Sequence, residues 1–166
     1  MALKIGADGV SVHINIGAES ESDMLRDLGN IAIQCHEWGM PLLAMMYTRV
    51  EKFKNERSVE GIKHAARIAA ELGADIVKVS YPGSRDGFEQ VVMGCPIPVV
   101  IAGGEKAEDE RNIFQIIKDS IDAGGAGVSI GRNAFQHENK RAVVRAICGI
   151  VHEGISVDKA LEILST

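Results

Sequence analysis

Residues 73–83 read GADIVKVSYPG, and the strand inside this stretch decides the fold. Asp75–Ser80 is rich in valine and isoleucine, which is typical of a β-strand. Alternation along a strand places Lys78 and Ser80 on one face and the valines that flank Lys78 on the other. A strand with one polar and one apolar face indicates a barrel, whose strands pack outward on helices and line a lumen inside. A strand of a doubly wound open sheet would more often be apolar on both faces.

Short apolar stretches alternate with helical stretches along the whole chain, and this pattern favours a parallel sheet in an α/β fold. The predicted strands are Val10–Gly17, Pro41–Tyr47, Asp75–Ser80, Pro98–Ala102 and Gly127–Ile130. The predicted helices are Ser20–Trp38, Ser58–Leu72, Arg85–Met93, Glu108–Ala123, Lys140–His152 and Val157–Leu164.

Local signals set the ends of two of these helices. Ser20 with Asp23 resembles a capping box, and Ser58 can cap the helix that begins there. Gly39 is a suitable helix stop, and Trp38 before it is predicted to lie in the helix core.

Five strand–helix units cannot close a (β/α)8 (TIM) barrel, for which about 250 residues are typical. We therefore predict one incomplete barrel domain over residues 1–166. Its sheet would have open edges, which are an aggregation hazard. Either three strand–helix units, on the order of 100 residues, are absent before Met1, or another chain covers the gap.

Composition excludes several classes of partner. The net charge of −5 gives no indication of a nucleic-acid or anionic-membrane partner, and the longest apolar stretches are too short to span a bilayer. No apolar signal segment follows Met1, so we expect a cytoplasmic protein.

The three cysteines lack metal-site spacing and are interpreted as buried thiols of a reducing compartment: Cys35, Cys95 and Cys148. No metal and no cofactor is predicted.

Lys78 is the strongest candidate for chemistry. Burying an ammonium is costly, so a lysine within an apolar strand is rarely there for packing. Burial lowers a lysine pKa and raises the fraction of free amine, which is the nucleophile that attacks a ketone or aldehyde. The alternative is a lysine at an exposed strand end whose amine reaches water.

Tyr47 and Arg49 lie at the end of the second predicted strand. A tyrosine at that end of a barrel strand can reach the mouth and exchange a proton with a substrate oxygen. Arg49 could hold a phosphate or a hydroxyl. The alternatives are a half-buried aromatic residue and a solvated loop charge.

Glycine turns follow the last two predicted strands. Gly103-Gly104 and Gly131-Arg132 could bring backbone N–H groups and a guanidinium to a phosphate, the position where barrel enzymes often bind one. His13 faces the predicted lumen and is either a substrate contact or a hydrogen-bonded core histidine. A basic loop with Lys52, Lys54 and Arg57 is interpreted as solvated surface.

Four segments together resemble the archaeal class I aldolase family over about residues 7–152. They are MMYTR at Met45–Arg49, GADIVKVSYPG at Gly73–Gly83, PVVIAGG at Pro98–Gly104 and GVSIGRNAFQH at Gly127–His137. The resemblance implies a TIM barrel of which these strands are the fourth to the eighth. It implies a phosphorylated sugar substrate and a homo-oligomer.

The resemblance also implies roles for particular residues. Lys78 would form the Schiff base, Tyr47 would be the proton donor, and residues 47–49, which include Thr48, would contact substrate. Gly103, Gly104, Gly131 and Arg132 would bind phosphate. Thr48 and Val50 depart from the family, which usually has proline and then glycine around the arginine. The family's general-base aspartate lies on the first strand, which this chain lacks.

Within the family, AMMY and residues 113–139 are more similar to 2-amino-3,7-dideoxy-D-threo-hept-6-ulosonate synthase. That resemblance implies transfer of a three-carbon keto unit onto L-aspartate semialdehyde, in an archaeal route to 3-dehydroquinate and aromatic amino acids. One alternative is class I fructose-bisphosphate aldolase of glycolysis and gluconeogenesis. The other is a catalytically incomplete fragment that keeps only the sugar-phosphate site.

Overall fold

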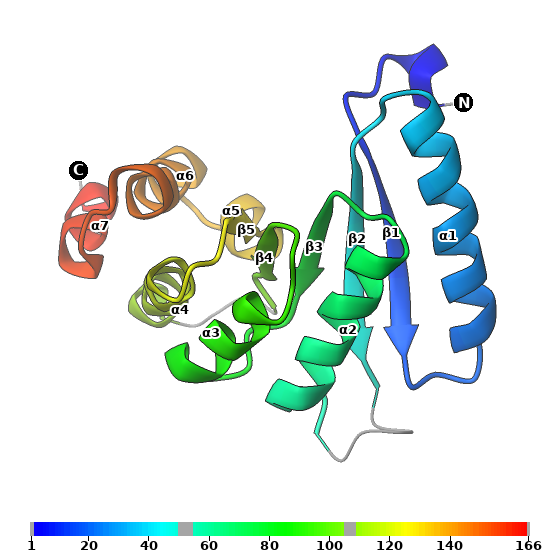
Figure 1. The fold of residues 1–166 in the computed structure, drawn as a ribbon. Helices are drawn as coiled ribbons and strands as arrows, with labels where there is room; N and C mark the ends of the chain where they lie inside the picture. Colours follow the sequence, from blue (N-terminus) through cyan, green and yellow to red (C-terminus); the bar gives the residue numbers. More distant parts are fainter. Residues whose placement is uncertain (1, 50–54, 105–108, 166) are drawn as a thin grey trace.

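A computed structural model describes residues 2–49, 55–104 and 109–165, and it has an α/β fold built on a five-stranded parallel sheet (Figure 1). The strands lie side by side in chain order, and every neighbouring pair is parallel. They are β1 (Val10–Ile16), β2 (Leu42–Thr48), β3 (Ile76–Val79), β4 (Val99–Ala102) and β5 (Gly127–Ser129). All five predicted strands are confirmed, each within one residue at either end.

Helices connect the strands and continue after β5. They are the short η1 (Ala2–Ile5), α1 (Glu21–Glu37), α2 (Val59–Glu71), α3 (Arg85–Met93), α4 (Glu110–Asp122), α5 (Arg132–Phe135), α6 (Lys140–Cys148), the π-helical η2 (Gly149–Glu153) and α7 (Val157–Leu164). The prediction missed α5 and η1, because four residues carry too little periodicity. It also joined α6 and η2 into one helix. None of the helices in the described ranges is long and apolar enough to cross a membrane.

The two predicted helix caps have different outcomes. Ser58 has extended backbone angles, φ −64° and ψ 133°, and its hydroxyl accepts a hydrogen bond from Gly61 N. The cap at Ser20 is wrong, because its ψ of 10° does not turn the hydroxyl toward the helix and the side chain forms no cap bond. Instead the Glu21 carboxylate accepts a 2.6 Å hydrogen bond from Gly17 N at this end.

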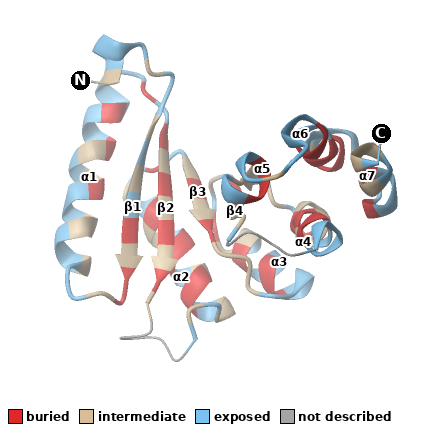
Figure 2. Ribbon diagram, turned by 180° about the vertical axis from the view of Figure 1, so that it is seen from behind, coloured by how far each residue is buried: buried red, intermediate tan, exposed pale blue. Residues whose placement is uncertain are grey.

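Among the described residues, one face of the sheet is buried under helices and the other is only partly buried. On β1 and β2 the buried residues alternate with less buried ones: Ile14, Ile16, Leu42, Ala44 and Met46 face the helices. The alternate residues include His13, Met45 and Lys78, which are neighbours across β1, β2 and β3. Figure 2 shows α1 and α2 on the same side of the strands. The helices therefore cover one face of a curved sheet, as a barrel wall requires and a doubly wound sheet does not.

Two burial predictions are wrong. Trp38 is 69% exposed, because α1 buries a stripe of Leu28, Ala32 and Cys35 and Trp38 follows the helix end outside that stripe. Cys148 is exposed, whereas Cys35 and Cys95 are buried, and none of the three is in a disulfide. Cys148 lies next to the buried Ile147 on α6, about 100° around the helix axis from it.

Candidate functional site

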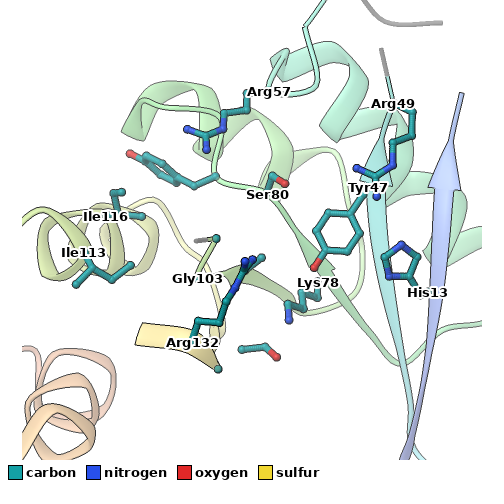
Figure 3. A pocket seen from close by; sticks show the side chains of 15 residues that line it. His13, Tyr47, Arg49, Arg57, Lys78, Ser80, Gly103, Ile113, Ile116 and Arg132 are labelled. Atoms are coloured by element: carbon teal, nitrogen blue, oxygen red, sulfur yellow. The ribbon is translucent and has the colours of Figure 1, made fainter. Parts of the chain in front are cut away.

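A pocket of about 530 Å³ opens at the carboxyl ends of the strands (Figure 3). In parallel α/β sheets this is the end at which ligands bind. Residues from all five strands, from the segments that follow them and from α4 line it: His13, Tyr47, Arg49, Arg57, Lys78, Ser80, Tyr81, Ala102, Gly103, Gly104, Ile113, Ile116, Ser129, Gly131 and Arg132.

Lys78 lies in β3 near the middle of the pocket. Its neighbours across the sheet are Met45 of β2 and Val100 of β4, so it shares their inward-facing position. The side chain is half-buried, and this burial lowers the pKa of its ammonium. Within the described ranges Lys78 makes no hydrogen bond and no ion pair that would stabilise the charged form. The result is an amine with a larger neutral fraction than an exposed lysine has.

Tyr47 stands beside Lys78 at the end of β2. The centroid of the Tyr47 ring lies 5.0 Å from the centroid of the His13 ring and 5.8 Å from the guanidinium carbon of Arg49. Burial raises the pKa of the Tyr47 hydroxyl, and the positive charges of Arg49 and Arg132 oppose that rise. The hydroxyl is therefore protonated at neutral pH and can donate a proton. Figure 3 shows it directed to the part of the pocket that holds Lys78.

Two glycine turns lie on the other side of Lys78. Gly103 and Gly104 follow β4, and Gly131 and Arg132 follow β5. Gly104 has φ +66°, a conformation that glycine adopts without strain. A Cβ added to Gly103 would lie 2.8 Å from Ile130 Cγ2, so a larger residue there needs the turn to move. Turns of this kind let backbone N–H groups approach an anion, and Arg132 adds a charged donor.

The charge of the pocket opposes that of the whole chain. Its described lining contains Arg49, Arg57, Lys78 and Arg132 and no aspartate or glutamate, although the chain carries a net charge of −5. A cleft lined by one sign of charge attracts ligands of the other sign. The pocket therefore suits a small anion such as a phosphate ester. In residues 2–49, 55–104 and 109–165, no three His, Cys, Asp or Glu side chains gather so as to hold a metal.

The model of one protein family, described as DeoC/LacD family aldolase, matches residues 1–137. The chain belongs to this family. The archaeal class I aldolase resemblance is thus confirmed at family level.

Two enzymes whose sequences are similar to this chain are synthases of amino keto acids. The chain is 42% identical over 160 residues to 2-amino-3,7-dideoxy-D-threo-hept-6-ulosonate synthase of Halobacterium salinarum, covering 96% of this chain and 60% of that enzyme. It is 39% identical over 151 residues to 2-amino-4,5-dihydroxy-6-oxo-7-(phosphonooxy)heptanoate synthase of Streptomyces griseus, covering 91% of this chain and 55% of that enzyme.

The fold of the chain is also similar to that of solved aldolase structures. A structure of the Schiff-base-forming fructose-1,6-bisphosphate aldolase superposes with a TM-score of 0.87 at 32% identity, covering 91% of this chain and 61% of that one. The aldolase-family chain thus spans about 60% of the length of the relatives it matches.

Seven of the eight residues predicted for the aldolase site line this one pocket. They are Lys78, Tyr47, Arg49, Gly103, Gly104, Gly131 and Arg132. Thr48 is not among the residues that line it. Alternation along β2 turns Thr48 to the buried face, where its hydroxyl donates a hydrogen bond to the backbone carbonyl of Glu56. The Thr48 side chain therefore supports the segment around Glu56. Thr48 also lines an adjoining pocket together with Tyr47 and Arg49, and its contact with substrate stays a prediction.

Other residues of the site were missed or misjudged. Arg57 is exposed, as predicted, and it also lines the pocket, which the prediction missed. Lys52, Lys54 and Val50 lie outside the described residues. His13 is exposed in the pocket, so the core-histidine alternative is wrong.

Asn133, which no pattern singled out, is buried in α5. Its side-chain amide donates a 2.8 Å hydrogen bond to the carbonyl oxygen of Gly103. Its position directly after Arg132 was the only available signal in the sequence.

Proposed function

We propose that Lys78 forms a Schiff base with the carbonyl group of a phosphorylated keto substrate. One observation carries the proposal: an amine that is half-buried, and that has no ion pair among the described residues, shares a pocket with two glycine turns and a tyrosine. The turns at Gly103–Gly104 and Gly131–Arg132 would hold the phosphate of that substrate. Tyr47 would exchange the proton.

The chemistry follows from the neutral amine. Its lone pair attacks the carbonyl carbon, and the carbonyl oxygen takes up a proton to give a carbinolamine. Loss of water then gives a protonated imine. The imine accepts the electron pair released when the neighbouring carbon–carbon bond breaks, and it returns that pair when the bond forms. Tyr47, protonated at neutral pH, is placed to donate and recover a proton once the imine has formed.

We infer that β1 to β5 are the fourth to eighth strands of an eight-stranded barrel. Three observations support this assignment: the chain-order parallel sheet, the single covered face, and the span of about 60% of the relatives' length. Lys78 then lies on the sixth strand, and the phosphate turns follow the seventh and eighth, where barrel enzymes often bind phosphate.

The reaction we propose is that of 2-amino-3,7-dideoxy-D-threo-hept-6-ulosonate synthase, which would join a three-carbon keto unit to L-aspartate semialdehyde. The 42% and 39% identities to two synthases of amino seven-carbon keto acids support this choice. Fructose-bisphosphate cleavage is the second candidate, supported by the TM-score of 0.87 to an aldolase of that class. Both reactions use the same amine, so assays with both substrate pairs are needed to separate them.

Trapping of the imine tests the proposal directly. The chain is incubated with dihydroxyacetone phosphate, reduced with borohydride, and examined by mass spectrometry with peptide mapping. We expect a stable adduct on Lys78 and none in Lys78→Met, in which a buried apolar side chain replaces the amine. Lys63→Met, on helix α2, is the matched control, and it should form as much adduct on Lys78 as the unchanged chain does. A folded chain without an adduct on Lys78 contradicts the proposal.

A further inference from the structure

The groups of the pocket are spread across the sheet in a fixed order. The phosphate turns follow β4 and β5, Lys78 is on β3, Tyr47 is on β2 and His13 is on β1. A keto phosphate bound with its phosphate at the turns and its carbonyl at Lys78 must extend its remaining carbons toward β2 and β1. The part of the substrate beyond the reacting carbon–carbon bond therefore points toward His13.

Lengths agree with this direction. Neighbouring strands lie about 4.8 Å apart, so the backbones of β3 and β1 are separated by roughly 10 Å. A chain of four carbon–carbon bonds of about 1.5 Å each spans about 5 Å, and a hydrogen bond adds about 3 Å. Side chains from both strands reach into the remaining space. A substrate of six or seven carbons can thus reach His13, while a three-carbon keto phosphate ends at Lys78.

The ring of His13 is held in one orientation. Its Nε2 lies 2.8 Å from Oδ1 of Asn15, two residues along the same strand, and its ring contacts that of Tyr47. A carboxamide oxygen only accepts hydrogen bonds, so Nε2 carries the proton of the neutral ring. Nδ1 is then an acceptor, and it has no partner within the described residues. His13 is also exposed in the pocket and not packed in the core.

We propose that His13, oriented by Asn15, recognises the aldehyde-derived part of the substrate. Its Nδ1 accepts a hydrogen bond from a donor group on that part. The donor is an amino group in a seven-carbon amino keto acid and a hydroxyl in a ketohexose phosphate. The inference rests on the proposed function, since it places the carbonyl at Lys78. His13 would then determine specificity: it would contribute to the affinity for the long substrate and not to the affinity for the three-carbon keto phosphate.

Trapping with short and long ligands tests this role without requiring turnover. The short probe is dihydroxyacetone phosphate, and the long probes are fructose 1,6-bisphosphate and 2-amino-4,5-dihydroxy-6-oxo-7-(phosphonooxy)heptanoate. The concentration that gives half-maximal borohydride adduct is measured for each. His13→Ala should raise that concentration about tenfold for a long probe, as expected for one lost hydrogen bond, and leave the short probe within twofold. Both long probes carry hydroxyl groups and only the heptanoate carries an amino group, so a larger loss for the heptanoate than for fructose 1,6-bisphosphate would indicate a contact with the amino group.

Two further variants separate recognition from structure. His13→Asn retains an acceptor oxygen near the position of Nδ1 and should recover most of the affinity for the long probe. Ser11 lies on the same face of β1 but does not line the pocket. Ser11→Ala should therefore leave the half-maximal concentration of both probes unchanged. Equal weakening of short and long probes by His13→Ala would overturn the proposal, as would no weakening of either. A wild-type chain that traps no ligand refutes the proposed function itself, which is a different outcome.

Discussion

The side-chain amide of Asn133 donates a 2.8 Å hydrogen bond to the backbone carbonyl oxygen of Gly103. The two residues belong to different strand–helix units, yet each adjoins one of the two glycine turns that we propose bind the substrate phosphate. The bond therefore fixes the distance between the turn after β4 and the turn after β5. A phosphate that contacts both turns depends on that distance.

Asn133→Ala should weaken phosphate binding. The loss of one buried hydrogen bond costs about 1 kcal/mol, and a similar loss in binding corresponds to roughly a fivefold higher half-maximal concentration of dihydroxyacetone phosphate in the trapping assay. Asn112→Ala, at an exposed position of α4, is the control and should change nothing. Unchanged trapping by the Asn133 variant would show that the turns keep their spacing without this bond.

Gly103→Ala should destabilise the fold. The new methyl group would lie 2.8 Å from Ile130 Cγ2, and overpacking of this kind costs about 1–3 kcal/mol. Gly29→Ala is the matched control, because it lies within α1 with nothing inside 4 Å of the added carbon. That substitution should stabilise the chain by about 0.5–1 kcal/mol, since alanine is the better helix former. Urea unfolding of both variants measures the difference, and equal stability of the two would contradict the argument.

The strands of this fold were predictable because alternation is a strong local signal. In β2 alone, alternate residues are buried from Leu42 to Thr48, and the same alternation would have placed Thr48 on the buried face. The family motif suggested a substrate contact for Thr48, which stays a prediction, whereas the strand pattern accounts for its burial.

Features that depend on tertiary contacts were not predictable. Trp38 was expected in the core because it is large and apolar, but its burial depends on which residues face the sheet from α1. Arg57 was expected at the surface and is exposed, but its place in the pocket lining could not be predicted, because chain segments distant in sequence form the pocket wall. Asn133 has a role only because Gly103, which is 30 residues earlier, lies beside it.

The stability of the chain should depend on pH through Lys78. Burial lowers the pKa of Lys78 in the folded state, so between that pKa and the unfolded value the unfolded chain binds more protons. Stability therefore rises with pH across this window, and below it the folded chain carries the full cost of a buried charge. Lys78→Met should be more stable than the unchanged chain at neutral pH, and the difference should shrink as pH approaches 10.5. Urea unfolding from pH 7 to pH 10.5 measures it, and a constant difference would rule out this contribution.

Tyr47→Phe should separate imine formation from proton transfer. The variant keeps the ring and its contact with His13 but loses the hydroxyl, which is the group with a proton to exchange. Borohydride trapping of dihydroxyacetone phosphate at Lys78 should be nearly unchanged. Deuterium uptake from heavy water at the carbon beside the trapped carbonyl should fall about a hundredfold, the lower end of what a general acid contributes.

Tyr81→Phe is the control for the loss of a phenol in the same pocket. The Tyr81 hydroxyl is engaged by Asp119 of α4 at 3.5 Å, and burial together with that carboxylate raises its pKa to about 12. A hydroxyl that donates to Asp119 is not available to the substrate, so removing it should leave deuterium uptake unchanged. If the two variants slow uptake equally, the proton does not pass through Tyr47. If Tyr47→Phe also abolishes trapping, the tyrosine acts in imine formation and not after it.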